Sequence, residues 1–346
     1  MIPHLIAHPS QPRLLQFIYD FDAKTTTIVP VELNAGDLVR GEPTIVDRLL
    51  RYPIAQAGHW LCATMHVREF GEPAFVERWD WDSLAEVEKL EIDYPRFGLM
   101  GMGVSDDGER AVLAGYFPVE QEDEGSSPAL ADDTVIVLQR SDELRACVVG
   151  LPDVGMVGAL PFNAGIGSFV FNADKTRVAA SLYDQDRCSV NVYELGPTGA
   201  EPIADLASEQ IVTDFEQGCS VFLPGGELLV WSVQNWDFAG KVGVYAIASE
   251  DRRLDVDVDS GVEVEVEDEE RFSLLIENTE LMPYVAEGVA VVGTVGGIAI
   301  IDIGSGAVTQ RRCDGAGAVC QVRRCGDHLV LVDHESRLFV MPAELD

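Results

Sequence analysis

The sequence is poor in basic residues, and above all in lysine. Of its 346 residues only 24 are lysine or arginine, against 59 aspartate and glutamate, which gives a formal net charge of −35. The lysines are four in number: Lys24, Lys89, Lys175 and Lys241. Because a polyanion without a basic stretch repels phosphate backbones, we predict that the protein does not bind nucleic acid. The charge would suit a basic partner, but it favours the plainer interpretation of a well-solvated surface.

Long apolar runs are also missing. No 18 consecutive residues are apolar, so the sequence predicts no membrane-spanning helix. The first eight residues, Met1 to His8, carry no lysine or arginine and too short an apolar stretch for a secretory signal. The seven cysteines are odd in number and scattered, and several lie within apolar runs such as Ala146–Val149. This pattern is typical of buried thiols in a reducing compartment, so we expect a cytoplasmic protein without a disulfide framework.

Motifs of the common enzyme classes are absent from the sequence. It contains no Gly-x-Ser-x-Gly elbow, no glycine-rich phosphate loop and no His-Glu-x-x-His. Cys325, His328 and His334 lie close together, but their spacing matches no common zinc pattern. Carboxylates gathered from several repeats around a central metal would leave no local motif. A propeller hydrolase or lactonase with a divalent metal at its channel therefore stays open as an alternative.

What the sequence does contain is a recurring pair of short apolar runs around a tight turn. In Gly103–Tyr116, one run ends, Asp106–Gly108 makes the turn, and a second run begins at Ala111. Copies of this pattern are found at Gly58–Thr64, Phe171–Leu182, Phe222–Trp231, Ala286–Val292 and Cys325–Val332. Most copies are followed by a third run of alternating character, and then by a polar turn and a fourth run. We interpret Phe17–Val29 as a third-to-fourth-strand hairpin of the same unit.

Four sequential antiparallel strands repeating every 40 to 65 residues, without a long amphipathic helix, are typical of propeller blades. We therefore predict an all-β fold with a single β-propeller domain over residues 1–346. Seven blades are expected, with six as the alternative, and pairing of the N- and C-terminal strands would close the ring. The predicted blades cover approximately residues 1–45, 46–93, 94–150, 151–207, 208–261, 262–315 and 316–346.

At the end of the third strand of the blade at 46–93, the chain reads Trp79-Asp80-Trp81-Asp82. In this respect it resembles the WD-repeat propellers, whose Trp-Asp pair lies at about this place. The resemblance extends over nearly the whole chain but concerns the fold alone, because only one blade carries the pair. It implies a scaffold that presents loops to other proteins.

In such a propeller, the second-to-third-strand loops and the blade-to-blade connections emerge on one face. Two of these loops are longer than the rest, and long loops on a rigid ring are common binding sites. One is the acidic segment around Phe117, Glu120, Glu122, Asp123 and Glu124; the other carries Asn235, Trp236 and Phe238. Trp236 and Phe238 are candidate interface anchors, or else they cover a blade edge. The acidic segment is a candidate contact or a solvated insertion.

A further acidic feature begins at Asp255, Asp257 and Asp259, whose alternate spacing is that of a calcium loop. The glycine and the closing glutamate that such a loop requires are replaced by Ser260 and Val266. Alternation of valine and carboxylate instead favours strands with valines on the packed side and carboxylates in water. We expect no cofactor, with calcium or another divalent metal as a weak candidate at these three residues.

From these observations the sequence predicts a non-catalytic interaction scaffold that binds a protein partner through its loop-rich face. We expect a monomer or a subunit of a hetero-complex. The alternatives are the metal-dependent hydrolase and a structural subunit of a larger assembly.

Overall fold

The computed structural model describes most of the chain, and the structural statements below concern that part. The described residues are 3–56, 58–64, 74–92, 98–104, 110–118, 130–139, 145–150, 165–174, 176–184, 187–195, 200–206, 217–233, 240–258, 283–286 and 288–344. They contain no helix long and apolar enough to cross a membrane. All regular structure in them is β-strand.

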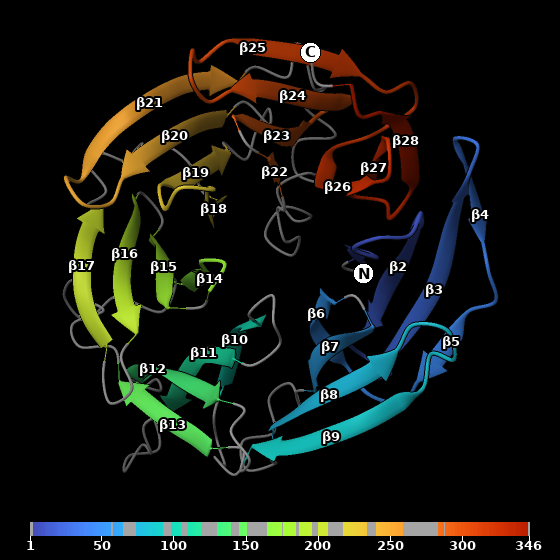
Figure 1. The fold of residues 1–346 in the computed structure, drawn as a ribbon, viewed down its shortest axis with the longest axis horizontal. Helices are drawn as coiled ribbons and strands as arrows, with labels where there is room; N and C mark the ends of the chain where they lie inside the picture. The colour runs from blue at the N-terminus through green and yellow to red at the C-terminus, as the bar shows by residue number, and fades with distance from the viewer. Residues whose placement is uncertain are drawn as a thin grey trace.

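The strands form antiparallel sheets that stand around a common axis (Figure 1). The first sheet contains β1 (Pro3–Ala7), β2 (Arg13–Asp20), β3 (Thr25–Asn34), β4 (Asp37–Arg40) and β5 (Thr44–Val46). The second contains β6 (Leu50–Ala55), β7 (His59–Thr64), β8 (Ala74–Asp80) and β9 (Glu86–Ile92). The third contains β10 (Gly98–Val104), β11 (Arg110–Pro118), β12 (Leu130–Gln139) and β13 (Arg145–Gly150).

The remaining sheets continue the same order. The fourth contains β14 (Gly165–Phe171), β15 (Arg177–Asp184), β16 (Arg187–Leu195) and β17 (Ala200–Leu206). The fifth contains β18 (Gln217–Phe222), β19 (Leu228–Val233), β20 (Gly240–Ala246) and β21 (Asp251–Val258). The sixth contains β22 (Tyr284–Ala286), β23 (Val289–Thr294), β24 (Gly297–Asp302) and β25 (Val308–Arg312). The last contains β26 (Val319–Cys325), β27 (His328–Asp333) and β28 (Leu338–Pro342).

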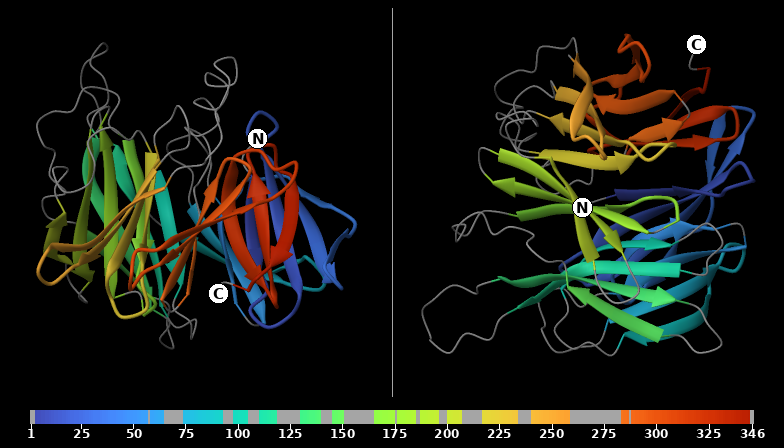
Figure 2. Two further views of the ribbon diagram at one scale, coloured as in Figure 1. Left: turned by 90° about the horizontal axis from the view of Figure 1, so that it is seen from above. Right: turned by 60° about the vertical axis from the view of Figure 1, so that its left-hand side comes forward.

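Within each sheet, strands follow one another in chain order from the axis outward. Six sheets have four or five strands, and the last has three. In the first sheet, β4 and β5 both pair with β3, so together they occupy the fourth-strand position. The all-β propeller with four-stranded antiparallel blades is thus confirmed. Seen from the side in Figure 2, the strands run between the two faces of the ring.

One expectation about the N-terminus is wrong, and a second, the pairing of the terminal strands, is not shown. Phe17–Val29 does not join a third and a fourth strand, because β1 precedes it in the sheet and the turn at 20–25 joins β2 to β3. The N-terminal region therefore has enough strands to form its own sheet. Accordingly, among the strand pairs of the described residues none joins the first sheet to the last. The two sheets instead contact each other through side chains: Leu5, Leu14 and Val31 pack with Val330 and Val332.

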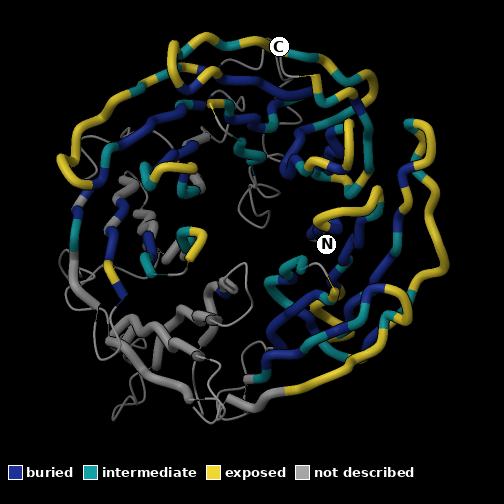
Figure 3. The backbone as a smooth tube through the Cα atoms, in the orientation of Figure 1, coloured by how far each residue is buried: buried dark blue, intermediate teal, exposed yellow. Residues whose placement is uncertain are grey.

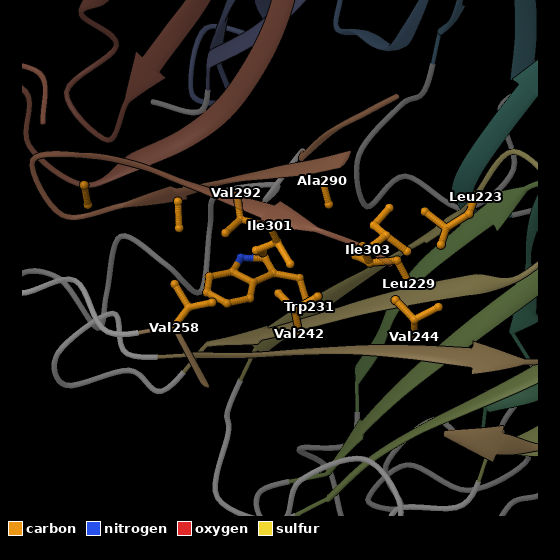
Figure 4. Close-up of a cluster of buried hydrophobic side chains, with 12 residues drawn as sticks. Leu223, Leu229, Trp231, Val242, Val244, Val258, Ala290, Val292, Ile301 and Ile303 are labelled. Atoms are coloured by element: carbon orange, nitrogen blue, oxygen red, sulfur yellow. The ribbon is translucent and has the colours of Figure 1, made fainter. Parts of the chain in front are cut away.

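The core lies between neighbouring sheets, where the two inner faces meet. Between the fifth and sixth sheets, Trp231 is 1% exposed and packs among Val242, Val292 and Ile301 (Figure 4). Clusters of the same kind join the first sheet to the second, the fourth to the fifth, and the sixth to the last. Burial follows the middle strands, whereas exposed residues follow outer strands and turns (Figure 3). A sheet that is apolar on both faces is covered only when a neighbour lies on each side.

Candidate interaction surface

The loop with the predicted aromatic anchors lies outside the described residues. Asn235, Trp236 and Phe238 belong to the segment between β19 and β20, and Glu120, Glu122, Asp123 and Glu124 to the segment between β11 and β12. Phe117 lies in β11, at a register shift in the pairing of β11 with β12. These candidate contacts remain predictions.

The aspartates of the calcium-like sequence lie on an outer strand. Asp255 and Asp257 are exposed on β21, and Asp259 falls outside the described residues. Asp255 forms an ion pair with Arg252 at 3.2 Å, and Asp257 with Lys241 at 3.4 Å. Side chains at alternate positions of a strand share one face, so both carboxylates point to water beside cations. Within the described part of the chain, no three histidine, cysteine or acidic side chains are grouped so that they could hold a metal ion.

A cluster of aromatic rings around one arginine lies where the first sheet meets the second. The Arg51 guanidinium carbon is 5.4 Å from the ring centre of Tyr19, 5.6 Å from that of Phe21 and 5.4 Å from that of Tyr52. We call these four residues the Arg51 cluster. Phe21 is 38% exposed, whereas Tyr19 is buried and Arg51 and Tyr52 are half-buried. In this cluster, the buried Tyr19 is held in place by its surroundings, and the Phe21 ring is accessible to a binding partner.

The connectivity places this cluster on the face that the sequence predicts for binding. Tyr19 lies near the end of the second strand, β2, and Phe21 is the first residue of the turn to the third strand, β3. Arg51 and Tyr52 lie at the start of β6, directly after the connection from the first sheet to the second. Antiparallel strands bring these two kinds of segment to the same end of the ring. This is the face that the sequence predicts for binding, although sequence reasoning did not single out these four residues.

The backbone is strained at Tyr52, next to Arg51. Tyr52 has a φ of +51°, a left-handed conformation that a bulky side chain rarely adopts. The pairing of β6 with β7 is shifted at the same point, between Arg51 and Ile54. Such a bulge re-aims side chains and is frequent next to functional sites. Here it brings the Tyr52 ring to the Arg51 guanidinium beside the rings of the first sheet.

Buried polar groups hold the connection that carries the cluster. Thr26 is fully buried; its Oγ1 donates to the carbonyl of Arg48 at 2.8 Å and accepts from the Leu50 N–H at 2.9 Å. The Arg48 side chain lies over the Trp79 ring, 5.5 Å from its centre. A partner that contacts Arg51 would therefore meet a preorganised surface, which reduces the entropy lost on binding.

Arg48 in turn reaches a fully buried carboxylate, that of Glu77. Arg48 Nε and Nη2 donate to Glu77 at 2.9 and 2.8 Å, and Trp79 Nε1 donates at 3.0 Å. Thr64 Oγ1 donates to the same carboxylate, and Glu86 also accepts from Arg48. Burial alone would raise the pKa of Glu77, but these hydrogen bonds and the Arg48 charge outweigh it and lower the pKa below its ordinary 4.5. Glu77 is thus ionised, and it fixes Arg48 in the connection that precedes Arg51.

Low pH should therefore reduce the free energy of unfolding of the protein, because it protonates Glu77. Because its folded-state pKa lies below 4.5, ionised Glu77 stabilises the fold above pH 4.5, and this contribution is lost as pH falls through the folded-state pKa. We expect the difference in free energy of unfolding between the wild type and Glu77→Gln to be largest at neutral pH and to shrink below pH 4.5. Urea unfolding of both proteins from pH 7 down to pH 3 measures it. A difference that stays constant over this range would contradict the assignment.

The Arg51 cluster was missed by sequence reasoning. Its two halves lie about thirty positions apart in the printed sequence, and no local motif joins them. The only available signal was the aromatic pair Tyr19 and Phe21 beside a predicted turn, together with Arg51-Tyr52 at the start of a strand.

Neither the protein-family models nor the curated proteins that were compared match the sequence. Solved structures do match the fold. Hydrazine synthase of Kuenenia stuttgartiensis is 12% identical with a TM-score of 0.61, covering 99% of this chain and 96% of its own. The β-propeller domain of Cps50 (Swd1) from Myceliophteria thermophila is 12% identical with a TM-score of 0.54, covering 97% and 94%. Sqt1 of Chaetomium thermophilum is 12% identical with a TM-score of 0.57, covering 97% and 80%.

At this level of identity the likeness concerns the fold alone. It extends over almost the entire chain, as the resemblance based on Trp79-Asp80 and Trp81-Asp82 implies. The protein therefore has a WD-repeat-like β-propeller fold.

Proposed function

We propose that the protein is a non-catalytic scaffold that binds a protein partner on the face bearing the second-to-third-strand turns. The observation that carries this proposal is the Arg51 cluster, with its exposed Phe21. Arginine and aromatic residues are enriched among the residues that dominate binding energy at interfaces. An arginine whose guanidinium is already stacked on rings loses little side-chain freedom when it binds. Trp236 and Phe238, in the segment that joins β19 to β20, are proposed as further contacts on the same face.

We infer further that the three-stranded sheet β26–β28 is the seventh blade of one closed ring. Side-chain contacts with both neighbours support this. Gln321 of β26 is fully buried and its Oε1 accepts the Leu5 N–H at 2.9 Å, and Arg323 Nε donates to the Leu5 carbonyl at 3.1 Å. On the other side, Val322 and Leu329 pack with Ile298 of the sixth sheet. A ring that is closed by the packing of the last sheet on both neighbouring sheets would give the binding surface a fixed shape.

The interaction is tested with the double variant Phe21→Ala and Arg51→Ala. We expect a protein from extracts of the source cells to be retained by the immobilised wild type and lost with the variant, as identified by mass spectrometry. Truncating a contact of this kind weakens binding by about 2 kcal/mol or more. Because Phe21 is partly exposed, the melting temperature should change little.

Val87→Ala provides the control, because Val87 is 63% exposed on the outer strand β9. It should leave the retained proteins unchanged. The proposal fails if wild type and double variant retain the same proteins, or if the double variant unfolds at a much lower temperature than the wild type.

A further inference from the structure

Among the described residues, the last sheet has no counterpart to the fourth strand of the other sheets. In each of the others, the third strand pairs with a fourth on its outer side: β4 with β5, β9, β13, β17, β21 or β25. β28, the third strand of the last sheet, pairs with β27 and with no other strand in the described part of the chain. We call its outer side the open edge. In the other sheets, the corresponding edge of the third strand is covered by one antiparallel strand.

The hydrogen bonds of β28 show which backbone groups lie on the open edge. Asp333 N donates to the Arg337 carbonyl at 3.1 Å, and Ala343 N donates to the Asp327 carbonyl at 2.9 Å. Bonding directions alternate along an antiparallel strand, so every second residue between 337 and 343 faces β27. The N–H and C=O groups of Leu338 and Val340 therefore point outward. They are the donors and acceptors that a further strand would pair with.

The side chains of β28 are apolar on both sides of the open edge. Leu338 and Val340 lie against Leu33 and Leu38 of the first sheet, and Phe339 lies on the side of the sixth sheet. These three of the five residues of β28 are only half-buried. The corresponding residues of β24, which has a fourth strand beside it, are almost all buried. A strand on the open edge would remove this apolar surface from water.

Two arginines lie on the faces of the neighbouring sheets that are turned toward the last sheet, one on each side of it. Arg311 pairs with Ile298, whose side chain packs on the last sheet, so Arg311 of β25 lies on that side of its sheet. Arg40 pairs with Val31, which packs on the last sheet from the first. Among the described residues neither arginine has an ion pair, in a protein with more than twice as many acidic as basic residues. Both charges would be matched by carboxylates on a strand placed between them.

We propose that β28 binds an extended acidic segment of a partner protein, which adds to the last sheet as its fourth, antiparallel strand. Its backbone would bond to Leu338 and Val340, and carboxylates on its two faces would meet Arg311 and Arg40. Strand addition of this kind obtains affinity from main-chain hydrogen bonds and specificity from alternate side chains. This surface is separate from the Arg51 cluster and goes beyond the function proposed above.

A single thin strand fits this edge better than a second copy of the protein does. β28 lies one strand closer to the axis than β4 and β25, which stand on either side of it (Figure 1). Two recessed edges of this kind cannot meet without a clash of the outer strands beside them. Ala343, which follows β28, stays bonded to Asp327 on the β27 side.

The probe is a fluorescent peptide, acetyl-Thr-Val-Glu-Glu-Val-Thr-Val-amide, with matched peptides that carry Gln-Gln or Lys-Lys at its centre. We expect the 346-residue chain to bind the Glu-Glu peptide most tightly in fluorescence polarisation, and Lys-Lys least. Val340→Pro removes one outward N–H and leaves the bonds to β27 intact. It should weaken binding about fivefold, since a backbone hydrogen bond contributes about 1 kcal/mol. Val340→Ala, which keeps the N–H, is its control.

Charge is tested with Arg40→Gln combined with Arg311→Gln. This pair should weaken binding of the Glu-Glu peptide and leave the Gln-Gln peptide unaffected. Hydrogen exchange gives an independent readout: in the protein alone the Leu338 and Val340 amides should exchange quickly while Phe339 and Met341 are protected, and the Glu-Glu peptide should slow the first two.

Several outcomes would overturn the proposal. One is equal binding of the three peptides, or binding that Val340→Pro does not change. Another is protection of the Leu338 and Val340 amides from exchange in the protein alone. If the protection persists in dilute protein, the chain covers its own edge. If it appears only as the concentration rises, together with a dimer in sedimentation, a second copy of the protein covers the edge. The variant Phe21→Ala with Arg51→Ala should bind the peptide like the wild type, so failure here is distinguishable from failure of the proposed function.

Discussion

Replacing Glu77 by leucine is expected to lower the free energy of unfolding by about 3–5 kcal/mol, the usual result of removing one member of a buried ion pair. The substitution leaves Arg48, Thr64 and Trp79 with donors that pointed at the lost carboxylate. Glu77→Gln keeps the shape and one acceptor, so its effect should be smaller, about 1–3 kcal/mol. Urea unfolding at neutral pH measures both values.

Glu86→Gln is the matched control. Glu86 pairs with the same arginine but is 34% exposed, so its loss should lower the free energy of unfolding by about 1 kcal/mol or less. If Glu77→Leu and Glu86→Gln have equal effects, Glu77 does not fix Arg48 as described above. A second consequence can be measured on the surface: if Arg48 loses its place, the connection that carries Arg51 becomes less ordered, and its amides should exchange faster in Glu77→Leu.

Trp231→Ala is expected to lower the free energy of unfolding by a similar amount, about 3–5 kcal/mol. The ring is enclosed by residues of two sheets (Figure 4), so its removal leaves a cavity that neither sheet can fill without moving. Trp231→Phe retains most of the apolar volume and should have a much smaller effect. Unfolding in urea, followed by circular dichroism, measures the change.

Val87→Ala is again the control, since an exposed side chain on an outer strand should change stability by about 0.5 kcal/mol or less. A loss below about 1 kcal/mol for Trp231→Ala would mean that the fifth and sixth sheets do not depend on each other for stability, contrary to their packing around this ring.

Much of the fold was predictable because its signals are local. The turn copies at Gly58–Thr64, Phe171–Leu182 and Ala286–Val292 all join the first and second strands of a sheet, as predicted. Alternation of apolar and polar residues over five or six positions, followed by a tight turn, is sufficient to specify a hairpin. The alternation at Asp255 and Asp257 likewise places carboxylates in water and valines on the packed side.

The position of a hairpin within its sheet was less predictable. Phe17–Val29 has the same local pattern whether it joins second and third or third and fourth strands. Its place depends on β1, a strand of five residues whose backbone pairs with β2 and whose Leu5 packs against the last sheet. The expected pairing of the terminal strands is not seen among the described residues, where the N-terminal region fills four strand positions of its own.

The sequence by itself determined that this chain folds into four-stranded antiparallel units that need neighbours on both faces, because strand periodicity and turn chemistry act over a few residues. Only the tertiary structure brought Tyr19 and Phe21 to Arg51, paired Glu77 with Arg48, and gave β28 no outer strand from the described residues. Those arrangements depend on how whole sheets pack around the axis, and contacts between residues far apart in the chain leave no trace in a local pattern.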